Sequence, residues 1–174
     1  MDRVAQIKID RNSDITSVIN EYRAAGVLGI GDLAKGVDII EEMVKGGSTV
    51  FLGLAGPLVA SGLRNIIADL IRDGLVQAVV SNGANLVHDL IEAFGGGHYK
   101  GAFALDDATL HDQGLGRIGN VLTKTSDFET FETRIQTMLQ DMDEGLRENI
   151  GVAELTSELG KRVDDNKSLL KTAL

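Results

Sequence analysis

Apolar residues recur at helical spacing near the start of the chain and predict two helices there. The first is expected over residues 14–25, with Asp14 as its N-cap. The second is expected over residues 30–44 and ends at Gly46-Gly47. Their apolar faces are formed by Ile15, Val18, Ile19 and Tyr22 in the first helix and by Leu33, Val37, Ile40 and Val44 in the second. We therefore predict a separate helical segment over residues 1–47.

Two short apolar runs without polar alternation predict buried strands, at residues 48–54 and 75–80. A small-residue turn follows each run, and an amphipathic helix follows each turn, at 58–72 and 85–94. The repeated order of strand and helix predicts two parallel strands joined by a right-handed crossover. The fold class is therefore α/β, with a Rossmann-like parallel sheet and flanking helices.

The rest of the chain is predicted to be irregular at first and then mostly helical. Residues 98–125 show no clear period, so we expect irregular chain there, with at most a short extended pair. Amphipathic helices are predicted at 128–146 and 151–162, and a last helical stretch at 165–174. Together with the strands, these elements predict a second domain over residues 48–174.

The predicted sheet is incomplete. Both strands are apolar on both faces, which is typical of strands inside a covered sheet. A parallel sheet of only two strands leaves two unpaired edges and rarely stands alone. We therefore expect a second half or a partner chain to supply the missing strands.

Charge and composition exclude several classes of function. There are 17 lysines and arginines against 26 aspartates and glutamates, so the net charge is −9. This disfavours a nucleic-acid partner and is compatible with a cationic substrate such as a polyamine, although acidity can also serve solubility alone. The absence of cysteine excludes disulfides, thiolate catalysis and cysteine-based zinc sites, and the three histidines lack metal-ligand spacing. No apolar run suits a signal peptide or a membrane span, so we expect a cytoplasmic protein.

Small residues follow both predicted strands, in the turns at 53–57 and 81–85. Ligands of open α/β sheets bind outside the carboxyl ends of the strands, and backbone N–H groups at helix starts attract anions. The turns therefore suggest a site for a dinucleotide pyrophosphate. Ordinary tight turns also need small residues, and neither a GxGxxG motif nor a Walker lysine is present.

Polar residues near these turns are further candidates. His88 could act as an acid, a base or a ligand contact, or it could be a solvated histidine at a helix start. The segment His98–Lys100 could line the same site. The Arg117–Asn120 segment suits loop structure, and Asp106-Asp107 could receive a cation or simply face water.

An ordered series of motifs resembles the N-terminal half of the deoxyhypusine synthase family, over roughly residues 27–165. The motifs are LGLAG, SGLR, NGANLVHD, HYKG and RIGN, and their form is closer to the bacterial and archaeal synthase-like members. The resemblance implies an NAD-dependent aminobutyl transferase with a Rossmann-like domain, which would make 48–174 a partial NAD-binding domain. In that family NAD oxidises spermidine, and the aminobutyl group passes through an imine on an active-site lysine to an acceptor amine. The acceptor is a lysine of the hypusine-bearing translation factor or, in some members, putrescine.

The resemblance also assigns residues. The segments that contact NAD fall on Gly56, Pro57, Leu58, Val59 and Ala60 and on Asn82, Gly83 and Ala84. His88 takes the place of a family glutamate that touches both NAD and spermidine, and Val87 takes the place of the neighbouring acid. Asn120 of the RIGN motif is a further substrate contact. Because two acids are replaced here, recognition of the spermidine cation is expected to be weaker than in the eukaryotic pattern.

Family members are considerably longer, and their catalytic lysine lies in a glycine-rich segment of their second half. None of the eight lysines here has such surroundings, so we expect no catalytic residue in this chain. The chain would then be one half of a split or cleaved enzyme that assembles into a family-like tetramer with sites at a dimer interface. The alternative is a non-catalytic subunit that activates a full-length family member, and an unrelated nucleotide-binding protein is a third reading.

Overall fold

The computed structural model describes residues 1–174 and divides them into two compact units, Met1–Val50 and Phe51–Leu174. In the first unit, helix α1 (Ile15–Ala25) packs against helix α2 (Leu28–Lys45). Asp14 caps α1 as predicted, because its carboxylate accepts a hydrogen bond from the Ser17 amide at 2.7 Å. The two helices are thus confirmed, and α2 begins two residues earlier than the prediction.

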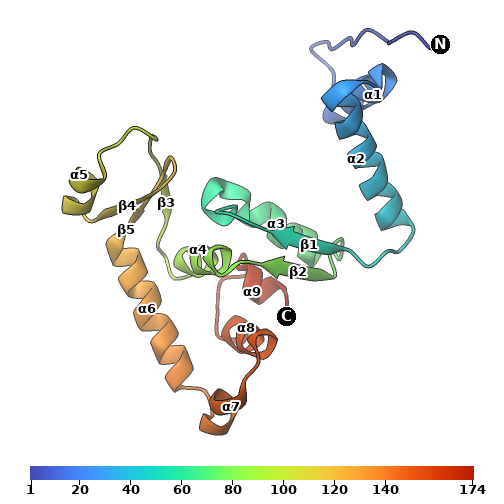
Figure 1. Cartoon of the computed structure of the whole chain (residues 1–174). Coiled ribbons are helices and arrows are strands. Elements are labelled where there is room, and N and C mark those ends of the chain that lie inside the picture. The colour runs from blue at the N-terminus through green and yellow to red at the C-terminus, as the bar shows by residue number, and fades with distance from the viewer. The chain divides into compact units, whose positions relative to one another are not determined.

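The second unit contains the predicted parallel strand pair (Figure 1). Strand β1 (Phe51–Leu54) pairs with β2 (Ala78–Ser81), and the register places Leu54 opposite Ser81. The connection between them contains helix α3 (Arg64–Arg72), which packs on the strands through a core of Leu54, Val59, Ile67, Ala68 and Leu169. The structure therefore confirms a mixed α/β chain with a small parallel sheet and flanking helices.

The helix predicted over 58–72 is interrupted. Its first part is a π-helical turn, η1 (Val59–Leu63), and Gly62 inside it has a φ of 94°. Side chains other than glycine rarely adopt this left-handed conformation, so Gly62 allows the chain to change direction before α3 begins. The apolar period of the segment gave no sign of this break, because it continues across Gly62.

A second sheet occupies the region that we expected to be irregular. Strands β3 (His98–Lys100), β5 (Val121–Lys124) and β4 (Leu115–Ile118) form an antiparallel sheet in that order, and helix α5 (Asp107–Asp112) precedes β4. The prediction of at most one extended pair was therefore wrong. Strands of three or four residues are too short to display the alternating pattern that identifies a strand in a sequence.

Helices complete the second unit. Helix α4 (Gly83–Ala93) follows β2, and α6 (Thr125–Gln140) follows β5. The predicted helix at 128–146 ends early at Gln140, because Asp143 caps a separate helix, α7 (Glu144–Asn149). The chain ends with α8 (Val152–Lys161) and α9 (Leu169–Thr172). A second core of Leu90, Met138, Met142, Leu159, Val163 and Leu170 joins α4, α6, α8 and α9.

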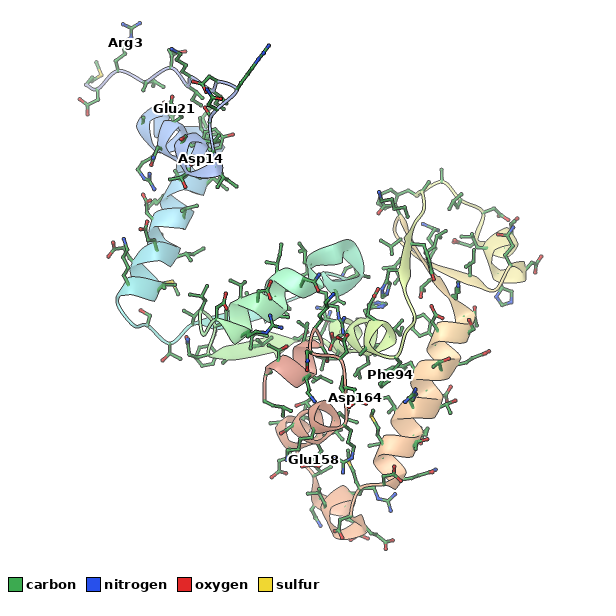
Figure 2. The ribbon with its side chains drawn as sticks, turned by 180° about the vertical axis from the view of Figure 1, so that it is seen from behind. Arg3, Asp14, Glu21, Phe94, Glu158 and Asp164 are labelled. Carbon is green, nitrogen blue, oxygen red and sulfur yellow. The ribbon has the colours of Figure 1, made fainter.

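Figure 2 shows where the side chains of these helices lie. Phe94, at the C-terminal end of α4, lies beside α6, and the guanidinium carbon of Arg134 stands 5.7 Å from the centre of its ring. Glu158 lies on α8 and pairs with Lys161 and Arg162 of the same helical segment. Helix α6 therefore holds α4 from one side, and α8 and α9 lie on the same core.

The parallel sheet has two free edges, since β1 and β2 each pair on one side only. Phe51 and Val80 are 69% and 63% exposed, which is unusual for large apolar residues in a parallel sheet. A cavity of about 460 Å³, walled mainly by apolar side chains, lies between β2 and helices α8 and α9. None of the helices is both long and apolar enough to cross a membrane.

Candidate functional site

The two turns that follow β1 and β2 lie side by side. The Asn82 amide donates a hydrogen bond to the Leu54 carbonyl at 3.4 Å, so the two strand ends stay joined where the strands stop. Deeper in the molecule, the amide of Val59 donates to Oδ1 of Asn85 at 3.2 Å. Val59 belongs to Gly56–Ala60, the first segment predicted to contact the cofactor, and Asn85 directly follows Asn82–Ala84, the second. These hydrogen bonds therefore bring the two segments together.

The first segment presents backbone rather than side chains. Gly56 and Pro57 are exposed and Leu58 is half-buried, whereas Val59 and Ala60 are buried in the core beside α3. A ligand at this turn would therefore meet the peptide groups and the faces of small residues. The side chains of Val59 and Ala60, both predicted cofactor contacts, serve packing.

The second segment is the N-terminus of α4. Asn82 is the N-cap, and its Oδ1 accepts hydrogen bonds from the amide and the side-chain nitrogen of Asn85. The next two residues, Gly83 and Ala84, are exposed, and their amides lie among the first-turn donors that a helix leaves without intrahelical partners. With the positive end of the helix dipole, these donors fit a phosphate group, although neither segment contains a lysine or arginine.

His88 lies one helical turn after this N-terminus and is only 6% exposed. Its Nδ1 is 2.9 Å from Nε2 of His98, whose Nδ1 is 2.6 Å from a carboxylate oxygen of Glu92. The ring of Phe128 stands edge-on to His88 at 6.3 Å. The interpretation of His88 as a solvated histidine was therefore wrong, and His98, which could line the same site, contacts His88 directly.

Burial lowers the pKa of His88 below its ordinary value, because the charged imidazolium is poorly solvated inside the protein. The neighbouring His98 lowers the pKa further by charge repulsion. A neutral imidazole at pH 7 can accept a hydrogen bond or a proton, which is the chemistry that a base or an amine-binding residue requires. No group of three or more histidine and carboxylate side chains is arranged to hold a metal ion.

Comparison with known proteins identifies the family. The family model described as deoxyhypusine synthase matches residues 17–174. The chain belongs to the deoxyhypusine synthase family. It is 39% identical over 171 residues to a protein of Methanothermobacter thermautotrophicus named "probable deoxyhypusine synthase", covering 98% of this chain and 55% of that protein. It is 42% identical over 168 residues to a "probable deoxyhypusine synthase 1" of Methanosarcina mazei, covering 95% of this chain and 51% of the relative.

A solved structure shows the same fold. A crystal structure from Entamoeba histolytica, described provisionally as a deoxyhypusine synthase, superposes with a TM-score of 0.66 at 16% identity, covering 97% of this chain and 58% of that one. The chain spans about half the length of the curated relatives it matches. The resemblance to the N-terminal half of deoxyhypusine synthases is thus confirmed, and the matched stretch is longer than the motifs alone indicated.

The RIGN motif, which carries part of the likeness to deoxyhypusine synthases, forms a turn away from His88. Asn120 is exposed between β4 and β5, and its carbonyl accepts a hydrogen bond from the Gly101 amide at 2.8 Å. His98 and Asn120 lie toward opposite ends of the β3–β5 pairing. His98 pairs with Thr123 at one end, whereas Asn120 directly precedes Val121, which pairs with Lys100 at the other end. No hydrogen bond or ion pair therefore joins Asn120 to the other predicted site residues. Val87 is half-buried on α4 next to His88.

The other charged candidates support loop structure. Arg117 pairs with Asp107 at 2.7 Å and donates to the Gly119 carbonyl at 2.9 Å. Asp106 caps α5 by accepting a hydrogen bond from the Thr109 amide. Each of these groups thus has a local structural partner.

Asp89 is the important residue that the sequence reasoning missed. It is fully buried, and its carboxylate accepts hydrogen bonds from Arg64 Nε at 2.7 Å, Ser168 Oγ at 2.7 Å and the Leu169 amide at 2.9 Å. It therefore joins α3, α4 and α9. A signal was present in the sequence. Asn85 and Asp89 are four residues apart, so they lie on one side of α4, and each directly precedes an apolar residue, Leu86 or Leu90. Two polar side chains therefore lie at the apolar face of the helix.

Replacement of Asn85 by alanine tests the link between the two turns. The substitution removes the acceptor of the Val59 amide and leaves that buried N–H group unpaired, which we expect to lower the free energy of unfolding by about 1–3 kcal/mol. Urea unfolding followed by circular dichroism measures the loss. Asn65→Ala, at an exposed position of α3, is the control and should change stability by less than about 0.5 kcal/mol. Equal effects of the two variants would show that Asn85 does not hold the turns together.

Proposed function

We propose that this chain provides the N-terminal half of an NAD-dependent aminobutyl transferase of the deoxyhypusine synthase type. Membership of the family over residues 17–174 is the observation that carries the proposal. The donor would be spermidine. The acceptor would be a lysine of the hypusine-bearing translation factor, or putrescine.

The proposed NAD site is the pair of joined turns, Gly56–Ala60 and Asn82–Ala84. The first-turn amides of α4 and its positive helix end are suited to a pyrophosphate, and the exposed glycines allow close approach of a ligand to the backbone. Bound NAD would accept a hydride from the substrate amine. This chain's own residues would hold the phosphates through N–H groups and present His88 next to them.

Substrate recognition is proposed to involve His88 together with its neighbour Val87. A neutral imidazole accepts a hydrogen bond from an ammonium N–H group but does not attract it by charge. Long-range attraction of the polyamine would then come from the acidic surface, because the chain has a net charge of −9. We accordingly propose moderate affinity for spermidine, and a salt-dependent association rate.

The second half of the transferase is proposed to complete the parallel sheet. Three features support this: the free edges of β1 and β2, the exposure of Phe51 and Val80, and the share of the relatives' length that this chain spans. A strand added at a free edge would satisfy its backbone groups and cover these side chains. The complementary half would carry the catalytic lysine, and the assembled enzyme would form a family-like tetramer.

A complementation experiment tests the proposal. The chain is mixed with the part of the Methanothermobacter thermautotrophicus relative that lies beyond the matched stretch, and NADH is followed by its absorbance after addition of NAD and spermidine. We expect NADH to form only in the mixture, and only when spermidine is present. Each half alone, and the mixture with putrescine in place of spermidine, are the controls.

Two outcomes would contradict the proposal. A stable complex that neither binds NAD nor forms NADH would favour the alternative of a non-catalytic subunit, and addition of the chain to a full-length family member would then be expected to raise that enzyme's activity. Failure of the two halves to associate in size-exclusion chromatography would contradict the completion of the sheet.

A further inference from the structure

A chain of three side chains runs from the surface to His88. Glu92 is partly exposed, with 34% of its side chain accessible, and its carboxylate is 2.6 Å from Nδ1 of His98. The side chain of His98 is 5% accessible, and its Nε2 is 2.9 Å from Nδ1 of His88. The rings of the two histidines meet edge-on, with their centres 4.8 Å apart. The order of the chain is therefore Glu92, His98, His88.

When His98 is neutral, the chemistry of these groups fixes the direction of both hydrogen bonds. An ionised carboxylate can only accept, so Nδ1 of His98 must carry the proton that it donates to Glu92. In a neutral imidazole the other nitrogen is then an acceptor, so Nε2 of His98 accepts from Nδ1–H of His88. It follows that Nε2 of neutral His88 carries a lone pair and no proton.

The surroundings of His88 keep this arrangement in place. Its Nε2 makes no hydrogen bond within the chain, and the side chain lies on the same side of α4 as Ala84, four residues earlier in the proposed NAD segment. Asp127, an acid of the packed helix α6, accepts a hydrogen bond from the Gly97 amide at 3.1 Å. Phe128 contributes an apolar ring rather than a competing donor. The free nitrogen is thus available to a ligand.

We propose that Glu92 and His98 are positioning residues that hold His88 in its Nδ1–H tautomer, so that Nε2 accepts a hydrogen bond from the N–H group of an amine ligand. The identity of the ligand rests on the proposed function, whereas the tautomer is a property of the chain itself. The low pKa of His88 agrees with a neutral ring. This arrangement would let a histidine accept a hydrogen bond from an amine N–H group at a position where the family pattern has a carboxylate.

Nitrogen NMR of the histidine rings tests the proposal without any ligand. Two-bond proton–nitrogen spectra distinguish protonated from unprotonated ring nitrogens, and the chain has only three histidines, which His88→Gln and His98→Gln would assign. At neutral pH we expect both His88 and His98 to be protonated at Nδ1. The exposed His111 should show the Nε2–H form that a free imidazole prefers, and it serves as the internal reference.

Substitutions of Glu92 separate positioning from mere packing. Glu92→Ala removes the acceptor, so His98 should change to the Nε2–H form and donate to His88, which would then also carry its proton on Nε2. Glu92→Gln retains an acceptor oxygen and should restore the wild-type tautomers. Glu132→Ala, at an exposed position of α6, should leave all three histidines unchanged.

Two results would overturn the proposal: an Nε2–H tautomer of His88 in the wild-type chain, or an unchanged His88 in a folded Glu92→Ala variant. The wild-type spectrum decides the question even if that variant fails to fold. For the ligand, NAD and spermidine added to the complemented enzyme should shift the Nε2 resonance of His88 and leave His111 in place. If NADH forms but the Nε2 resonance of His88 does not shift, His88 does not bind the amine. If no NADH forms while the tautomers are as expected, the result contradicts the proposed transferase activity and not the tautomer of His88.

Discussion

Replacement of Asp89 by alanine is expected to lower the free energy of unfolding by about 3–5 kcal/mol, the largest loss among the substitutions considered. The carboxylate is fully buried and accepts hydrogen bonds from Arg64, Ser168 and the Leu169 amide. Without it, Arg64 would keep a positive charge that is only 11% accessible. Breaking a buried ion pair by removing one partner is costly because the remaining charge is poorly solvated.

The second partner of Arg64 limits this loss but does not prevent it. Asp165 lies 2.8 Å from Arg64, and its side chain is 26% accessible. Burial lowers the pKa of Arg64, but hydrogen bonds and charge attraction from Asp89 and Asp165 outweigh this effect and raise its pKa, so the guanidinium stays charged. Ser168 and the first turn of α9 have no such substitute, and we expect α9 to detach from α3 and α4.

Urea unfolding followed by circular dichroism measures the effect of Asp89→Ala, and hydrogen exchange of the α9 amides locates it. Asp69→Ala is the matched control, because it breaks an exposed ion pair with Arg72 within α3. It should lower the free energy of unfolding by less than about 1 kcal/mol. Losses of similar size in the two variants would refute the role of Asp89 as the joint between the three helices.

The sequence predicted the parts of the fold that leave a clear apolar pattern. The helices at 15–25 and 28–45 follow from helical periodicity, and the parallel strand pair follows from two apolar runs and the order of the elements. The antiparallel sheet of β3, β4 and β5 was missed, because its short strands show neither polar alternation nor the continuous apolar run that marked the parallel pair. The break at Gly62 was missed for a different reason, since its φ depends on a local turn that the apolar pattern does not record.

The candidate site divides in a similar way. The neighbourhood of the two turns could be predicted, because parallel strands end at the same edge of a sheet. The contact between His88 and His98 could only be suspected, since it depends on the path of the chain through Gly95-Gly96-Gly97 into β3. The sequence did not show that Asp89 connects three helices, because two of its partners, Ser168 and Leu169, are distant in the sequence. They lie at the start of α9, a helix of only four residues.

Gly160→Ala is expected to separate α8 from α9. A Cβ atom at Gly160 would lie 2.6 Å from the carbonyl oxygen and 3.0 Å from the carbonyl carbon of Leu170, and real Cβ atoms do not approach backbone so closely. Because backbone cannot rotate away as a side chain can, one helix must shift, and the contacts of Leu159 and Leu170 in the core would loosen. We expect a loss of about 1–3 kcal/mol, although alanine favours a helix more than glycine does.

Hydrogen exchange followed by mass spectrometry resolves this effect along the chain, and the amides of α8 and α9 should exchange faster in Gly160→Ala than in the wild type. Gly36→Ala adds the same methyl group inside α2, where no atom beyond the backbone of the same helix and the adjoining residues lies within 4 Å of the new Cβ. It should therefore slow exchange in α2, in line with a gain of about 0.5–1 kcal/mol from the change of glycine to alanine in a helix. If both variants slowed exchange, the close packing of Gly160 on Leu170 would be refuted.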